Sequence, residues 1–283
     1  MRFRLGDRVH DVTDRTLIMG ILNRTPDSFF DAGRTFALDA LLRLAEQLVA
    51  EGADVLDVGG VKAGPGPEVA EAEELDRVVP AIEELHTRFE TPLSIDTWRA
   101  AVLRAACAAG AVLGNDISGF ADPGYLPTAA EHGASVVATH IRLAPRVPDP
   151  EPHYDDLLGE VRAFLLARAG AAEAAGLAPE QIALDLGLDL GKTPAQSAVL
   201  LRQSDTFASL GYTLLLSGSS KRFLGELLDL AIDDRRDASL AAAAFGVMHG
   251  CRIVRVHDVV GSVRVCRMIE AVHAFERDGA RVT

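Results

Sequence analysis

The strongest constraint on the fold is a series of eight short apolar segments, each ending in polar residues or glycine and each followed by a helix-like stretch. The segments are 17–23, 54–60, 92–97, 112–118, 135–141, 182–188, 212–218 and 252–258. Parallel strands that are buried on both faces are continuous apolar runs, and eight alternations of strand and helix are typical of a closed barrel. The series therefore predicts an α/β fold, a (β/α)8 TIM barrel.

The length of the chain fits one such barrel. A (β/α)8 barrel takes about 250 residues, and this chain has 283. We therefore expect a single domain over 1–283, in which residues 1–16 form an N-terminal cap at the bottom and residues 17–278 form the barrel.

Charge and composition narrow the possible partners. The net charge of −13 argues against a nucleic-acid or membrane-surface binder, because both need a basic face. The chain begins without the apolar core of a signal peptide and has no uncharged apolar stretch of 18 residues. The three cysteines show no CxxC spacing, which favours buried free thiols. These features predict a cytoplasmic protein that acts on a small molecule.

The polar residues at the ends of the apolar segments indicate an enzyme. In a TIM barrel the carboxyl ends of the strands form the floor of the active site. We expect the following residues to meet at one mouth although they lie far apart in the sequence: Asn23, Asp57, Asp96, Asn115, His140, Asp185, Lys221 and His257. Arg255 precedes His257 by two positions on the same predicted strand, so both point to the same face.

Three loops after the strands stand out by composition. Loop one (23–34) is polar, loop two (60–69) is rich in glycine and proline, and loop five (142–152) holds four prolines and is expected to be an extended lid or interface segment. Gly191-Lys192-Thr193 is similar to the end of a phosphate-binding loop, but the glycine spacing is wrong. We expect it to open the sixth helix.

The ordered motifs at the strand ends resemble those of the dihydropteroate synthase family over residues 15–275. They are Met19-Gly-Ile-Leu-Asn-Arg-Thr-Pro-Asp-Ser-Phe29, Asp57-Val-Gly-Gly60, Ser94-Ile-Asp-Thr97, Asn115-Asp-Ile-Ser-Gly119, Asp185-Leu-Gly187 with Gly191-Lys-Thr193, Ser219-Ser-Lys-Arg-Phe223 and Arg255-Val-His-Asp258. The resemblance implies a transferase of folate biosynthesis. It would join 6-hydroxymethyl-7,8-dihydropterin pyrophosphate to p-aminobenzoate and release pyrophosphate.

The resemblance also implies roles for individual residues. Asp96, Asn115 and Asp185 would hydrogen-bond the edge of the pterin ring, and Lys221 would reach its acceptors; Asp96, Asp185 and Lys221 would be the catalytic set. The diphosphate would lie against Asn23, Arg255 and His257, and Asn23 would help to hold Mg²⁺. A homodimer formed by the last helices is implied as well. Structural roles stay open. Asp96 could be a helix N-cap or part of an ion pair inside the barrel, and Asn115 could cap the adjacent turn. Arg255 could pair with a carboxylate of a neighbouring helix, His257 could be a packed ring, and Lys221 could be a solvated loop residue.

The chain departs from the family pattern around the second substrate. After Asp57-Val-Gly-Gly60 the family typically continues Glu-Ser-Thr-Arg-Pro, whereas loop two here begins Val61-Lys62-Ala63-Gly64-Pro65. Arg24 stands where the family has a small residue, and Thr139 and Ser220 replace the usual Met and Arg. Leu188-Asp189-Leu190 replaces an aromatic wall. Arg24 and Lys62 are expected to add positive charge at the mouth.

Two alternatives to an active synthase follow. One is a paralogue that binds pterin but has lost or redirected aminobenzoate transfer. The other is a methyl-tetrahydrofolate-binding methyltransferase barrel. The motif Thr25-Pro-Asp-Ser-Phe29 and the pair Arg255 and His257 favour a diphosphate substrate over a methyl donor.

Overall fold

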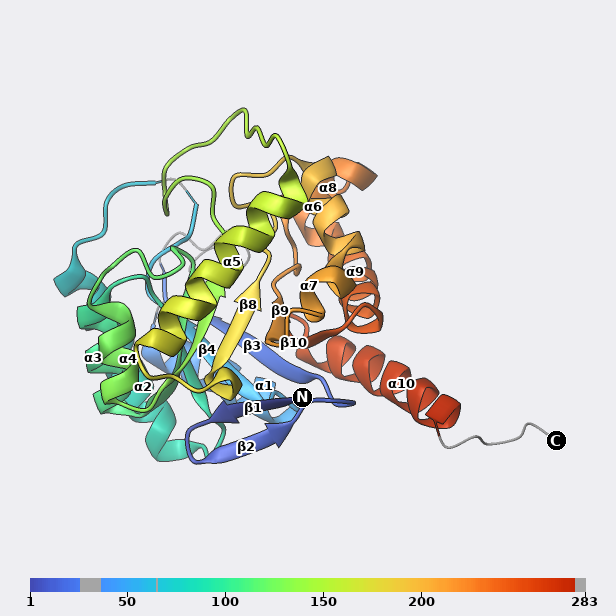
Figure 1. Cartoon of the computed structure of the whole chain (residues 1–283). Helices are drawn as coiled ribbons and strands as arrows, with labels where there is room; N and C mark the ends of the chain where they lie inside the picture. Colours follow the sequence, from blue (N-terminus) through green and yellow to red (C-terminus); the bar gives the residue numbers. More distant parts are fainter. Residues whose placement is uncertain (26–36, 65, 278–283) are drawn as a thin grey trace.

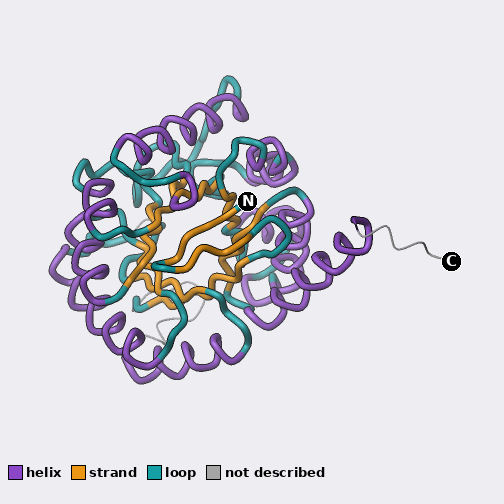
Figure 2. Tube along the Cα trace, turned by 60° about the horizontal axis from the view of Figure 1, so that its bottom comes forward, coloured by secondary structure: helices purple, strands orange, loops and turns teal. Residues whose placement is uncertain are grey.

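The computed structural model describes residues 1–25, 37–64 and 66–277, with side chains up to residue 274. Eight parallel strands close into a barrel in the order β10-β3-β4-β5-β6-β7-β8-β9 (Figures 1 and 2). They are β3 (Leu17–Asn23), β4 (Val55–Gly59), β5 (Leu93–Asp96), β6 (Ala111–Asp116), β7 (Ser135–Thr139), β8 (Ile182–Asp185), β9 (Thr213–Leu216) and β10 (Cys251–Val256). Each lies within one of the eight predicted segments, or overlaps it with a difference of one residue at its start, so the predicted TIM barrel is confirmed.

Helices surround this barrel on the outside (Figure 2). They are α1 (Leu38–Ala50), α2 (Glu71–Arg88), α3 (Ala100–Ala109), α4 (Tyr125–Glu131), α5 (Leu157–Ala174), α6 (Pro194–Arg202), α7 (Ser204–Ala208), α8 (Arg222–Leu228), α9 (Arg236–Met248) and α10 (Val259–Arg277), with 3₁₀ turns at Pro179–Gln181 and Ile232–Asp234. Within the described ranges, no helix combines the length and the apolar character that a membrane crossing needs.

The barrel interior changes from apolar to polar along its axis. Alternate strand residues point inward, so a residue two positions further along lies on the same face, one layer nearer the carboxyl end. In six strands this step leads from an apolar to a polar residue: Val55 to Asp57, Leu113 to Asn115, Val137 to Thr139, Ala183 to Asp185, Leu215 to Ser217 and Ile253 to Arg255. The apolar layer fills the bottom, and the polar layer lies beneath the mouth.

An antiparallel hairpin covers the bottom of the barrel (Figure 2). Its strands β1 (Arg2–Leu5) and β2 (Arg8–Asp11) pair from Arg2 opposite Asp11 to Leu5 opposite Arg8. Phe3, Leu5 and Val12 are buried and join the apolar layer of the interior. The hairpin therefore contributes side chains to the interior packing of the barrel.

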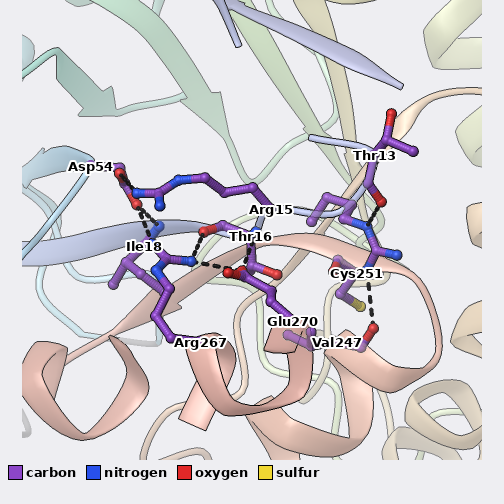
Figure 3. Close-up of polar contacts among 10 residues, drawn as sticks. Thr13, Arg15, Thr16, Ile18, Asp54, Val247, Cys251, Arg267 and Glu270 are labelled. Carbon is purple, nitrogen blue, oxygen red and sulfur yellow. Dashed lines mark hydrogen bonds and ion pairs between the residues drawn. The ribbon is translucent and has the colours of Figure 1, made fainter. Parts of the chain in front are cut away.

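Polar contacts fix the chain where it enters the barrel (Figure 3). The Asp54 carboxylate accepts a hydrogen bond from the Ile18 backbone at 2.9 Å and pairs with Arg15 at 2.9 Å. The Glu270 carboxylate on α10 accepts one from the Thr16 backbone at 2.7 Å and pairs with Arg267 at 2.6 Å. These contacts join the start of β3 to the last helix, at the end of the barrel opposite the predicted site.

Candidate active site

A cavity of about 570 Å³ opens at the carboxyl end of the barrel, between the strand ends and loops two and five. Five of the predicted site residues line it: Asn23, Asp96, Lys221, Arg255 and His257. Asn23 ends β3, Asp96 ends β5 and Lys221 follows β9, while Arg255 lies at the carboxyl end of β10 and His257 directly follows that strand, so closure of the barrel brings them together. Of loop one (23–34), the structure describes only residues 23–25. The motif Thr25-Pro-Asp-Ser-Phe29 therefore lies outside the described residues after Thr25.

Arg255 is the centre of the polar layer on the cavity floor. Its Nε donates to Asp57 Oδ2 at 2.6 Å, and its Nη2 donates to Asp96 Oδ2 at 2.7 Å. The Asn115 amide also donates to Asp57 Oδ2, at 3.2 Å. Burial raises the pKa of Asp96 to about 7, although the adjacent guanidinium favours the ionised form. Four strands thus meet in one hydrogen-bonded cluster.

Asn115 and Asp185 do not line the cavity, although the sequence places both at the site. Both are almost completely buried. Asp185 Oδ1 accepts a hydrogen bond from the Gly187 backbone at 2.9 Å, and burial raises the pKa of Asp185. The two side chains belong to the polar layer around the cavity floor, and the structure gives each a protein partner.

His257 and Lys221 both stand at the rim of the cavity. His257 Nδ1 lies 2.9 Å from Ser219 Oγ, which also accepts from the His257 backbone at 3.3 Å. Ser219 therefore fixes the orientation of the imidazole ring. The Lys221 ammonium has no hydrogen bond or ion pair with the residues that the structure describes.

Lys192 is buried next to the site, although the sequence analysis assigns it no role there. The Lys192 side chain is 1% exposed, and its ammonium donates to Gly187 O at 2.8 Å and Leu190 O at 3.0 Å. Its Nζ also lies 2.9 Å from His140 Nδ1. Burial lowers the pKa of Lys192 to about 7 and that of His140 to about 3. His140, which we expected at the mouth, instead helps to hold the loop after β8.

The sequence predicts only a helix start for the motif around Lys192. That prediction is confirmed, because Thr193 is the N-cap of α6 and forms a capping box with Gln196. A lysine between a glycine and a helix cap is the available sequence signal for the buried ammonium, but spacing alone does not show which carbonyl groups surround it.

Arginines from other parts of the chain hold loop two. Arg146 on loop five donates to Lys62 O at 2.8 Å and to Pro67 O, while Arg99 donates to Val69 O at 2.7 Å. Arg77 donates to Gly60 O at 2.8 Å. Loop five therefore contacts loop two across the mouth, and Arg146 is a functional candidate that the sequence does not single out.

Of the two cations expected at the mouth, only Lys62 lines the cavity. The guanidinium of Arg24 donates to the Arg77 backbone carbonyl on α2. Its backbone N–H donates to Gly59 O at 2.8 Å. The expectation for Arg24 is therefore wrong, since a backbone carbonyl outside the cavity takes its side chain.

The chain belongs to the class of pterin-binding barrels, because the family model described as pterin binding enzyme matches residues 19–257. The chain belongs to the dihydropteroate synthase family. It is 40% identical to dihydropteroate synthase of Bacillus subtilis, over 92% of this chain and 89% of that protein. It is 43% identical to inactive dihydropteroate synthase 2 of Mycobacterium leprae, over 92% and 91%. The structure of the Yersinia pestis synthase with a sulfonamide drug complex superposes with a TM-score of 0.92 at 38% identity, covering 97% and 99% of the two chains.

Proposed function

We propose that this protein is a pterin-binding transferase that joins 6-hydroxymethyl-7,8-dihydropterin pyrophosphate to an aromatic amine such as p-aminobenzoate and releases pyrophosphate. The observation that carries the proposal is the cluster on the cavity floor, where Arg255 lies between the carboxylates of Asp57 and Asp96. Membership of the dihydropteroate synthase family supports it.

The polar layer suits a flat ring with donors and acceptors along its edge. Buried polar atoms that stay unpaired cost about 1–3 kcal/mol each, so a ligand or water that pairs with them is favoured. Ser94 on β5 is the register neighbour of Asp57 and belongs to the same layer. Three side-chain atoms of this layer have no hydrogen-bond partner in the described part of the chain: Asp57 Oδ1, Ser94 Oγ and Thr139 Oγ1. We assign pterin binding to this layer, with Asp96 at the ring edge and Lys221 at its acceptors. Asn115 and Asp185 do not line the cavity, and in this proposal they complete the ring edge once the pterin lies on the cavity floor.

The rim residues suit the leaving group. When the carbon–oxygen bond breaks, its electron pair stays on the diphosphate, and the amine nitrogen forms the new carbon–nitrogen bond and loses one proton. Positive charge and hydrogen-bond donors beside the diphosphate stabilise the negative charge that grows there. Arg255 lines the cavity and can supply N–H donors, although its charge is shared with Asp57 and Asp96. His257, oriented by Ser219, lines the cavity beside it.

We propose Mg²⁺ as the metal that accompanies the diphosphate, with the Asn23 amide oxygen as a protein ligand. Mg²⁺ is usually bound by few protein oxygens together with substrate phosphates. Asn23 lines the cavity, and the described residues contain no cluster of three or more His, Cys, Asp or Glu that could hold a metal alone. The metal would neutralise diphosphate charge. Asn23→Ala should remove any gain in diphosphate affinity that Mg²⁺ gives in calorimetry.

Two measurements test the transferase proposal. Calorimetry with the pterin pyrophosphate measures binding, and a pyrophosphate-release assay with p-aminobenzoate measures transfer. Asp185→Asn keeps the volume but exchanges an acceptor for a donor, so pterin affinity should fall at least tenfold while the melting temperature changes little. His257→Ala should weaken the binding of the pterin pyrophosphate more than the binding of the bare pterin. Wild-type protein that binds no pterin would exclude the proposal.

A second candidate function is pterin binding without aminobenzoate transfer. The altered segment Val61-Lys62-Ala63-Gly64 favours it, since this segment lines the cavity, and so does the similarity to the inactive Mycobacterium leprae protein. Tight pterin binding without pyrophosphate release would select this candidate, and brisk release would exclude it. Methyl transfer is not proposed, because the matched relatives are named as dihydropteroate synthases.

We also propose a homodimer that forms through α9 and α10. Large apolar side chains on these neighbouring helices are exposed: Phe245 (38%), Met248 (62%), Met268 (64%) and Val272 (44%). A patch of this kind is typical of a protein interface. Light scattering should give twice the chain mass of 30.1 kDa, and a monomer would exclude this surface as an interface.

The three cysteines support the reducing cytoplasm as the compartment. Cys107, Cys251 and Cys266 are free, and burial raises the pKa of Cys251 and Cys266 to about 12. Cell fractionation that finds the protein outside the cytoplasm would exclude this placement.

A further inference from the structure

The cavity carries an excess of positive charge, although the whole chain has a net charge of −13. Six Lys and Arg side chains and three carboxylates are among its described lining residues. Each carboxylate is already engaged. Asp96 binds Arg255, Asp149 binds Arg142 through two contacts of 2.5 Å, and Asp189 accepts a backbone N–H at the start of α8.

Four of the cations have no carboxylate partner among the residues that the structure describes. The ammonium groups of Lys62 and Lys221 make no hydrogen bond or ion pair with those residues. Within the described part of the chain, Arg146 and Arg235 donate to backbone carbonyl groups only. Low-dielectric walls concentrate the field of such charges inside a cleft, so the cavity attracts anions.

Lys62 and Arg146 lie on two loops that touch at the outer rim. Arg146 Nη1 donates to the Lys62 carbonyl oxygen at 2.8 Å, and both side chains line the cavity. An anion that enters this part of the cavity therefore meets a lysine of loop two and an arginine of loop five, and each of them can attract it. Leu143 and Val147 line the same wall of loop five and are 47% and 50% exposed. The outer rim is therefore both cationic and apolar.

We propose that the second substrate is an aromatic amine whose body carries a further acidic group, with two carboxylates in total, and that Lys62 and Arg146 bind those carboxylates. This inference rests on the proposed transferase function, in which the pterin and its diphosphate occupy Lys221, Arg255 and His257. Of the four cations without a carboxylate partner, Lys62, Arg146 and Arg235 then remain, and Lys62 and Arg146 are the two whose loops touch at the outer rim. The apolar wall of Leu143 and Val147 packs against the ring or linker between the amine and the acid.

The test compares two ligands of equal length, 4-aminobenzoyl-glutamate and its neutral diamide, by calorimetry at low salt. An exposed ion pair contributes up to about 1 kcal/mol, which is about fivefold in affinity, so two pairs favour the diacid by up to about 25-fold. Lys62→Gln should reduce this preference about fivefold. The Lys62 ammonium makes no hydrogen bond or ion pair with the residues that the structure describes, so this variant should fold normally.

A matched control makes the same charge change at the other end of the barrel. Arg8→Gln on the bottom hairpin should leave the preference for the diacid unchanged. Raising the ionic strength should erode the preference of the wild type, because salt screens exposed charges. Equal affinity of the wild type for diacid and diamide overturns the inference, and so does a preference that persists undiminished in Lys62→Gln.

Both ligands are titrated into the free protein and into the protein saturated with pterin pyrophosphate. The preference for the diacid is thus decided whether or not pterin binds. Failure to bind pterin excludes the transferase proposal, whereas pterin binding without a preference for the diacid excludes only the inference about the second substrate.

Discussion

Replacing Lys192 by Met should destabilise the fold more strongly as the pH rises above 7. In the folded protein the ammonium is 1% exposed and its pKa is lowered to about 7 by burial, whereas an unfolded lysine keeps a pKa near 10.5. Between these values the unfolded state holds the extra proton, so wild-type stability rises with pH across this window. The Met variant lacks this contribution.

The linkage relation sets the size of the effect. One proton corresponds to about 1.36 kcal/mol per pH unit. Over the two units from pH 7.5 to 9.5, the free energy of unfolding of the wild type should therefore gain about 2.7 kcal/mol relative to Lys192→Met. The buried cysteines act in the opposite direction, since their thiols ionise more easily in the unfolded chain. They are present in both proteins and cancel in the difference.

Urea unfolding followed by circular dichroism at pH 7.5, 8.5 and 9.5 measures the gap, which is the difference in free energy of unfolding between the wild type and Lys192→Met. The same substitution at Lys62, on loop two, removes no buried ammonium and should give a gap that does not change with pH. A Lys192→Met gap that stays constant or narrows toward pH 9.5 would refute the reasoning.

Two further substitutions test the backbone and the charge cluster. A Cβ added at Gly187 would lie 1.9 Å from the His140 carbonyl oxygen at a φ of +63°, so Gly187→Ala should prevent normal folding or lower the melting temperature drastically. Gly176→Ala is the control, because Gly176 has a φ of +100° but a Cβ added there has no atom within 4 Å, so the substitution should cost only about 1–2 kcal/mol of strain. Equal losses of stability in the two variants would contradict the close contact at Gly187. Arg255→Met leaves the Asp96 carboxylate buried without its cation and should cost about 3–5 kcal/mol. Because the carboxyl can stay protonated at low pH, this loss should grow from pH 6 to pH 8 in thermal melts, and a variant as stable as the wild type at pH 8 would contradict the assignment.

The barrel can be predicted because strands that are buried on both faces are continuous apolar runs in the sequence. Segment 17–23 is apolar except at its end, and β3 (Leu17–Asn23) has the same boundaries. Position within a strand also predicts layer, so the sequence alone places Asp96 and Arg255 at the carboxyl end of the barrel.

Side-chain partners at the site cannot be predicted in the same way. The positions of Asn115 and Asp185 in their strands place both residues near the mouth. In the structure both are buried, and Asn115 donates to Asp57 while Asp185 accepts from the Gly187 backbone, which strand position does not predict. Lys192 escapes sequence-based prediction because the carbonyl groups that hold it come from the curvature of its own loop and from the residue that follows β7. Such contacts depend on three-dimensional packing, which the spacing of apolar and polar residues along the sequence does not predict.

The seam of the barrel has a consequence for how the protein is made. β10 pairs with β3, so the first and last barrel strands meet only after residues 251–256 have been synthesised. Asp57 and Asp96 leave the ribosome 198 and 159 residues ahead of Arg255. The nascent chain thus carries both carboxylates without their guanidinium until its final strand emerges. A polypeptide released before residue 251 has an open seam and an incomplete site, because the same strand closes the barrel and completes the charge cluster.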